Sequence, residues 1–272
     1  MSAAAAPPPD TDTGTIVQRV EDARMRARRA FALQFGLTWL VLLALLGGAL
    51  WLSGNVNLGF IASAGPYIVQ GAGLTILICL SSIVLAVVLA LLGALGRLST
   101  NPIINGIASL YVSLVRGTPL LVQIFFVYLA FPQLGLTLPV VVGGILALGF
   151  NYGAYMTEIF RAGIQAVPRG QREAAEALGM PERLVFRRVV LPQAFRIVIP
   201  AIGNDFIAMI KDSSLVYVLG VQELLWRAST LGRRNLASLE GLLIAAAVYW
   251  GLTIIFSFFQ DKLEKRMARG DR

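Results

Sequence analysis

Several apolar stretches of this chain are long enough to cross a lipid bilayer, which constrains the fold more than any other feature. A helix that spans the hydrocarbon core needs about 20 apolar residues. Hydrophobic residues make up 57% of the chain and charged residues 14%, with a mean hydropathy of +0.73, whereas about a quarter of the residues of a soluble domain are charged. The sequence therefore predicts an all-α integral membrane protein.

The apolar pattern predicts membrane-spanning helices with both ends of the chain in the cytoplasm. The six expected spans are residues 31–53, 67–95, 107–131, 139–160, 191–218 and 239–259. Arginines precede the first span and the tail 262–272 is basic, and an excess of Lys and Arg marks the cytoplasmic side. Arg227, Arg233 and Arg234 do not fit, because they fall in a loop predicted to be external. A short re-entrant or interfacial helix at residues 221–230 is our explanation for them.

The N-terminal region divides into two segments. Residues 1–30 begin with Ala, Pro and polar residues and end in a run rich in arginine. Because they lack apolar periodicity, we expect a disordered, basic cytoplasmic leader. The apolar run 31–53 is too long for the core of a signal peptide and lacks a clear Ala-x-Ala cleavage site. We therefore interpret it as a retained, additional N-terminal transmembrane helix.

The residue content excludes several classes of function. Histidine is absent and Cys79 is the only cysteine, so the chain cannot build a zinc cluster or a disulfide framework, and we expect no metal site. None of its lysines stands in the Gly-Lys-Ser/Thr context of a Walker A loop. The net charge of +8 is typical of cytoplasmic loops rather than of a nucleic-acid surface. We therefore expect no catalytic residue, no bound cofactor and no nucleic-acid partner.

The hydrophilic loop 161–190 carries an ordered motif. Its six arginines place it in the cytoplasm. Residues 172–178 are rich in good helix formers, and Gly179 follows where a left-handed C-cap would sit. Since proline is tolerated in a first helical turn, a second helix can begin at Pro181. The loop is thus predicted to form a helix, a glycine turn and a second helix. Its small apolar face would consist of Ala174, Ala175 and Leu178.

This loop resembles the coupling loop, or EAA motif, of bacterial ABC importer permeases. That motif reads EAA, three residues, G, nine residues, I, one residue, LP. The matching residues are Glu173, Ala174, Ala175, Gly179, Leu191 and Pro192, with Val189 at the usual Ile. Other stretches, above all 115–123, 158–164 and 211–215, are similar to those of the polar amino acid importer branch, such as glutamine, histidine and arginine permeases.

The resemblance covers residues 67–261 and implies a type I ABC importer transmembrane domain. Five helices would form its core, and the N-terminal helix would be an addition. The branch typically has Ala where Thr157 stands and Gly where Ala162 stands, which could alter helix packing near the substrate path.

The resemblance also implies partners. The loop would contact ABC ATP-binding subunits, which would bind the ATP. A periplasmic or extracellular solute-binding protein would deliver an amino acid substrate, and a second permease chain would complete a homodimer or heterodimer. The chain would lie in the bacterial inner membrane.

Polar residues within the predicted spans are candidates for a substrate pathway, because an ionisable group inside a membrane usually faces a cavity or a partner. In the polar span 191–218, Asn204 and Lys211 share one helical face. Asp205 and Asp212 share another. The candidate pathway residues are Glu158, Asn204, Asp212, Ser213, Thr118 and Gln123. The alternative is a structural network in which Lys211 pairs with Asp205 or Asp212.

The preferred hypothesis is a permease subunit that translocates polar amino acids into the cytoplasm, energised by a separate ATPase subunit. An ABC importer of another small polar solute would share these motifs. An ion-gradient-driven secondary transporter could use Asp205, Lys211 and Asp212 as an ion site, but it would need no docking loop and would commonly carry internal repeats. In a third class, a non-transporting scaffold, loss of the polar face of residues 191–218 would be harmless.

Overall fold

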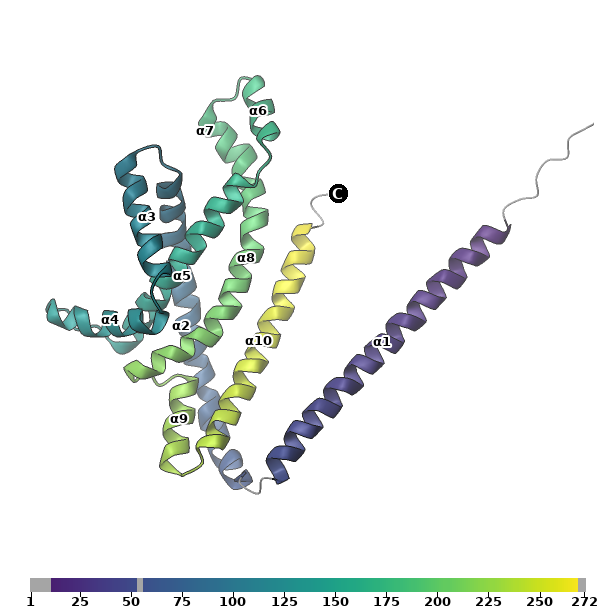
Figure 1. Cartoon of the computed structure of the whole chain (residues 1–272), viewed down its shortest axis with the longest axis vertical. Helices are drawn as coiled ribbons and strands as arrows, with labels where there is room; N and C mark the ends of the chain where they lie inside the picture. The colour runs from purple at the N-terminus through teal and green to yellow at the C-terminus, as the bar shows by residue number, and fades with distance from the viewer. Residues whose placement is uncertain (1–10, 53–55, 269–272) are drawn as a thin grey trace, which may run out of the picture. The chain divides into compact units, whose positions relative to one another are not determined.

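The structure is a computed structural model that describes residues 11–52 and 56–268, and within these ranges it contains helices and no strand (Figure 1). The chain divides into two compact units, Met1–Val56 and Asn57–Arg272. The expected all-α architecture is confirmed.

The first unit contains a single long helix, α1, Thr11–Leu52. Its segment Gln18–Ala49 is long and apolar enough to cross a membrane. The expectation of a disordered leader over residues 1–30 is wrong from Thr11 onward, and residues 1–10 lie outside the described part. The reason is that Ala and Arg are good helix formers and that an existing helix extends at little cost per residue.

The second unit contains the remaining helices. In chain order they are α2 Leu58–Leu98, α3 Pro102–Arg116, α4 Leu120–Gln133, α5 Val140–Gln165, α6 Arg169–Ala177, α7 Glu182–Val185, α8 Leu191–Asp212, α9 Leu224–Arg234 and α10 Ser238–Ala268. A π-helical turn, Phe186–Val190, leads into α8, and a 3-10 helix, Ser213–Leu219, follows it.

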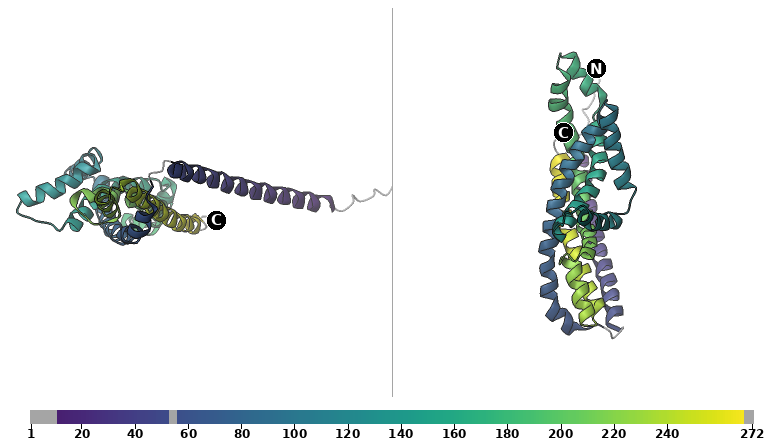
Figure 2. Two further views of the ribbon diagram at one scale, coloured as in Figure 1. Left: turned by 90° about the horizontal axis from the view of Figure 1, so that it is seen from below. Right: turned by 90° about the vertical axis from the view of Figure 1, so that its left-hand side faces the viewer.

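The long helices of the second unit run alongside one another, with α6 and α7 at one end and α9 at the other (Figure 1). Helix α4 extends sideways from them, as the two further views of Figure 2 also show. The two ends of this helical bundle therefore carry different short helices.

The number of spans differs from the prediction of six. Among the described helices, α1, α2, α5 and α10 are long and apolar enough to cross a membrane, and α3 with α4 makes a fifth span if the bent pair is counted as one. Helix α8 is not among them, because polar and charged side chains interrupt its apolar surface.

Two helix boundaries also differ from the prediction. The span expected at residues 107–131 is broken into α3 and α4, whose axes differ in direction by 109°. Helix α2 begins at Leu58 rather than at residue 67, and it contains Pro66 within its length. Asn57 caps its start by accepting a hydrogen bond from the Phe60 amide at 2.9 Å. The connection between the first two predicted spans, which was expected to end at residue 67, is therefore largely helical.

The close packing of α2 against α5 forms the centre of the second unit, and it depends on small residues. A Cβ atom at Gly149 would lie 2.6 Å from Leu85 Cδ2, and one at Gly153 would lie 2.9 Å from Leu89 Cβ. Gly93 on α2 meets Thr157, a fully buried residue of α5. Small residues of this kind let membrane helices approach closely.

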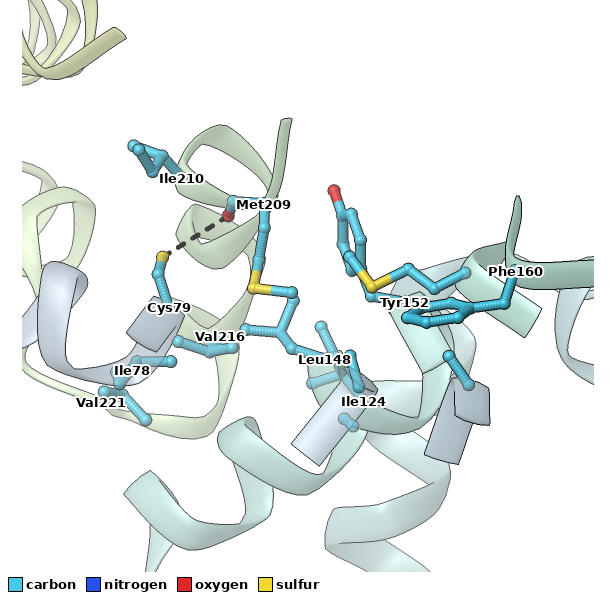
Figure 3. Close-up of a cluster of buried hydrophobic side chains, with 14 of the residues drawn as sticks. Ile78, Cys79, Ile124, Leu148, Tyr152, Phe160, Met209, Ile210, Val216 and Val221 are labelled. Carbon is cyan, nitrogen blue, oxygen red and sulfur yellow. Dashed lines mark hydrogen bonds between the residues drawn. The ribbon is translucent and has the colours of Figure 1, made fainter. Parts of the chain in front are cut away.

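The apolar core extends from α2 and α5 to α8 and the 3-10 helix (Figure 3). Cys79 is fully buried there, and its thiol donates a weak hydrogen bond to the Met209 carbonyl at 3.7 Å. Cys79 is thus a core residue.

Substitution of Gly93 by Ala should destabilise the protein, because the new methyl group overlaps the Thr157 side chain. Overpacking of this kind costs about 1–3 kcal/mol. Thermal unfolding in detergent should show a lower midpoint for Gly93→Ala. The matched control is Gly73→Ala on the same helix, where no atom lies within 4 Å of the new methyl group. Equal midpoints for the two variants would contradict the packing argument.

Candidate functional site

The loop between α5 and α8 forms the predicted helix, glycine turn and helix. Helix α6 ends at Ala177, and Gly179 follows with a φ of +77°, a conformation that favours glycine. The amides of Gly179 and Met180 donate to the carbonyls of Glu176 and Ala175 at 2.8 and 3.2 Å. These bonds satisfy carbonyl groups at the end of α6, so the turn is well defined.

The loop packs on the protein through one alanine and exposes its neighbours. Ala175 is buried in a small apolar cluster with Val185, Val190 and Ala194. In contrast, Ala174 is exposed and Leu178 is 83% exposed. The expectation of one open apolar face is therefore wrong for Ala175, because α6 folds back on the helices that follow it. The outward face includes Glu173, Ala174 and Leu178.

The loop continues directly into α8. The π-helical turn Phe186–Val190 joins α7 to Leu191, and Pro192 stands in the first turn of α8. Proline supplies no backbone donor, so the helix lacks one hydrogen bond where the π-helical turn meets α8. A displacement of the loop would therefore be transmitted to α8 through continuous helix.

Gln123 fills the break between α3 and α4. Its Nε2 atom donates to the carbonyls of Val115 and Thr118 at 2.7 and 3.1 Å, and it lies 2.9 Å from Thr118 Oγ1. Its Oε1 atom accepts a hydrogen bond from Asn151 on α5 at 3.1 Å. Backbone carbonyls that lose their helical partners at a break need other hydrogen-bond donors within a membrane. Gln123 supplies such a donor and, together with Thr118, stabilises the broken backbone.

An apolar cavity of about 460 Å³ lies beside this break. Thr118 and Gln123 are among its lining residues, and the others are mostly aliphatic or aromatic side chains of α3, α4 and α5. Irregular backbone at membrane depth is tolerated where it lines a cavity, and this is the arrangement observed.

The polar residues of α8 divide into the two predicted stripes. Asn204 and Lys211 are exposed, whereas Asp205 and Asp212 are half-buried. Asp212 Oδ2 accepts a hydrogen bond of 2.8 Å from the Tyr152 hydroxyl on α5. Asp205 Oδ2 is buried and has no hydrogen-bond partner in the described part of the chain.

The structural alternative for α8, a pairing of Lys211 with either aspartate, is not observed among the described residues, where the ion pairs involve Glu158. Ser213 is fully buried and donates to the Ile210 carbonyl at 2.7 Å. Ser213, the first residue of the 3-10 helix that follows α8, is thus enclosed by the core.

Glu158 joins three helices at the end of the bundle that carries α6. One of its oxygens accepts from Arg97 Nε at 3.2 Å, and the other pairs with Arg161 Nη2 at 2.7 Å. Arg97 in turn donates to Ser109 on α3. Arg116, at the end of α3, lies over the Tyr155 ring at 5.2 Å. Glu158 therefore links α2, α3 and α5.

Glu223 is a buried acidic residue that the sequence reasoning missed. It is fully enclosed before α9 and caps that helix by accepting from the Trp226 amide at 2.8 Å. It also accepts from the Tyr249 hydroxyl on α10 at 2.6 Å and from Thr75 on α2 at 3.3 Å. One available signal was its position as the single acidic residue between Asp212 and Glu240.

These features define a class of protein: a multi-pass helical membrane protein with a broken span and an ordered helical loop at one end. The family model for the binding-protein-dependent transport system inner membrane component matches residues 82–269. The chain belongs to this family of transport permeases.

Named relatives agree with the family match. The L-cystine transport system permease protein TcyB of Bacillus subtilis is 40% identical over 75% of this chain and 88% of its own length. The arginine transport system permease protein ArtQ of the same organism is 36% identical over 79% of this chain and its full length.

Solved structures show the same fold. An amino acid ABC transporter crystallised with histidines matches 78% of this chain and 99% of its own chain, with 36% identity and a TM-score of 0.74. The MetNI methionine ABC transporter in an inward-facing form matches 73% and 93% of the two chains, with 15% identity and a TM-score of 0.59, a likeness of fold alone. The fold is that of a type I ABC importer transmembrane domain.

Substitution of Gln123 by Leu should destabilise the break between α3 and α4. The carbonyls of Val115 and Thr118 would lose their donor, and each unsatisfied buried group costs about 1–3 kcal/mol. The expected result is a lower thermal unfolding midpoint in detergent. Gln133→Leu is the matched control, because Gln133 is exposed at the end of α4. A midpoint that falls equally in both variants would refute the role of Gln123.

Proposed function

We propose that this chain is the transmembrane permease subunit of an ABC importer that carries polar amino acids into the cytoplasm. The observation that carries the proposal is the loop 169–190, in which the EAA-type residues form an ordered helical elbow joined to α8. The amino-acid class is supported by the cystine and arginine permeases among the relatives. The chain would lie in the bacterial inner membrane with this loop in the cytoplasm.

ATP would be bound and hydrolysed by separate ATP-binding subunits, and this chain would need no cofactor of its own. The exposed Glu173, Ala174 and Leu178 would contact such a subunit, while the buried Ala175 anchors the elbow to the permease. Only a partner that binds the elbow differently in two states can shift the conformation of the permease. Because the elbow continues into α8, such a shift would move the helix that carries Asp205 and Asp212.

The substrate pathway would run along the polar stripes of α8. Asp212, already bonded to Tyr152, would supply an acceptor for the ammonium group of an amino acid. Asn204 is exposed on the neighbouring stripe and would supply a donor and an acceptor. Thr118, Gln123, Glu158 and Ser213 make structural bonds, so we give them supporting rather than substrate-binding roles.

The other partners would be a second permease chain and an external solute-binding protein. The family description names dependence on a binding protein. The described residues of α3 and α4 expose many apolar side chains, including Ile107, Leu110, Phe126 and Leu129. Such a surface fits lipid and a second permease chain, either identical or related.

The substitution Gly179→Val should abolish transport while leaving membrane insertion intact. Valine disfavours the positive φ of this turn, and the strain of about 1–3 kcal/mol would displace the elbow from its docking position. Uptake of a labelled amino acid panel would be measured in cells that lack the native chain and carry either version. Gly170→Val in the same loop is the control, since that site is open and its φ is not positive. Normal uptake by Gly179→Val would refute the coupling role.

A second pair of variants tests the pathway. Asp212→Asn should lower uptake roughly tenfold or more, because a hydrogen bond to a charged group is worth about 1.5–3 kcal/mol. Tyr152→Phe removes the bond that Asp212 accepts but leaves the carboxylate, so its uptake should fall much less. Both would be compared at equal amounts of protein in the membrane. Equal losses in the two variants would assign Asp212 a structural role instead.

A further inference from the structure

The three arginines that do not fit the charge rule, Arg227, Arg233 and Arg234, all lie on α9, at the end of the bundle opposite to α6 and α7 (Figure 1). A short helix was predicted in this region, and α9 confirms it. With the loop 161–190 in the cytoplasm, this end faces outward. Basic residues are uncommon on that side of a membrane protein, so each of them needs a reason.

Arg227 has a structural reason. Its Nε atom donates to the Gln222 carbonyl and its Nη1 atom to the Tyr67 carbonyl, both at 3.0 Å. Its guanidinium group also lies 4.7 Å from the centre of the Tyr67 ring. Gly71 on α2 allows α9 to approach closely, because a Cβ atom at this position would lie 2.8 Å from the backbone of Leu224. Arg227 therefore fastens α9 to α2.

Arg233 and Arg234 have no such partner. Both are exposed at the end of α9, and in the described part of the chain neither forms a side-chain hydrogen bond or an ion pair. The connections that precede α2 and α5 carry no cation in the sequence. Among the described residues of α9, these two guanidinium groups are therefore positive charges without a side-chain partner.

The turn that follows them is held in a defined shape. The Ala237 amide donates to the Gly232 carbonyl at 2.8 Å, and the Asn235 side chain donates to the Leu231 carbonyl at 2.9 Å. Leu236 has a φ of +53° and is 97% exposed. A non-glycine residue in this conformation is uncommon. The turn thus presents an apolar side chain beside two charges.

We propose that Arg233, Arg234 and Leu236 form a docking surface for the solute-binding protein of the importer, which would offer an acidic surface with an apolar depression. This proposal rests on the proposed function and adds the place of contact. Arginine is enriched at protein interfaces, and complementary charge speeds association. A fluid layer of lipid headgroups could neutralise the arginines, but it would not require the shaped turn that exposes Leu236.

The first experiment measures uptake of the labelled amino acid panel by the double variant Arg233→Glu, Arg234→Glu. We expect uptake to fall roughly tenfold, because the reversed charges repel an acidic partner. Arg233→Lys with Arg234→Lys keeps the charge and should retain most uptake. Lys262→Glu with Lys265→Glu reverses two exposed charges at the other end of α10 and should have little effect. Unchanged uptake in the glutamate variant overturns the docking surface.

The second experiment places a photo-reactive benzoylphenylalanine at position 236 in intact cells. We expect an adduct that mass spectrometry identifies as an external solute-binding protein and that is lost in the Arg233→Glu, Arg234→Glu background. Adducts with phospholipid alone, or an adduct that persists after charge reversal, overturn the proposal. If the unmodified chain supports no amino acid uptake, the proposed function fails instead, and the adduct still reports what contacts this surface.

Discussion

The contact between α2 and α5 is the interaction on which the rest of the structure depends. In a membrane the hydrophobic effect does not drive helices together, because lipid tails are as apolar as the helix surfaces. Helices associate instead where they pack against each other more closely than lipid packs against them. Gly93, Gly149 and Gly153 provide it by leaving room for the side chains opposite. Thr157, noted as a departure from the usual Ala, occupies the space at Gly93. The helices α3, α8, α9 and α10 then pack around this pair.

Polar side chains hold the structure at several places where the regular helices end or break. Gln123 satisfies the carbonyls freed between α3 and α4, and Glu223 joins α9 to Thr75 and Tyr249. At the other end of the bundle, Glu158 joins α5 to α2 through its ion pair with Arg97. An unsatisfied polar group is costly at membrane depth, so these residues allow the irregular backbone that a transport pathway requires. The same chemistry made Gln123 and Glu158 resemble substrate ligands in the sequence.

The long apolar helices and the loop were predictable because their signals are local. The lengths of the apolar stretches predict α1, α2, α5 and α10. The order of helix-forming residues and glycine predicts the elbow around Gly179. The errors arose where local signals conflict with packing. The second span was predicted to begin at residue 67, but α2 begins at Leu58 and contains Pro66. Ala175 was predicted to lie on the apolar face of the loop with Ala174 and Leu178, but it is buried against Val185 and Val190.

The sequence by itself determined that this is a helical membrane protein, that its loop carries the EAA-type residues, and that Gly179 occupies a left-handed turn. These properties depend on composition and on residues close together in the chain. Only the tertiary structure decided which polar groups meet: Tyr152 with Asp212, Arg97 with Glu158, and Glu223 with Thr75 and Tyr249. Those partners are 26 to 148 residues apart, and a linear pattern does not specify which faces of two helices come together.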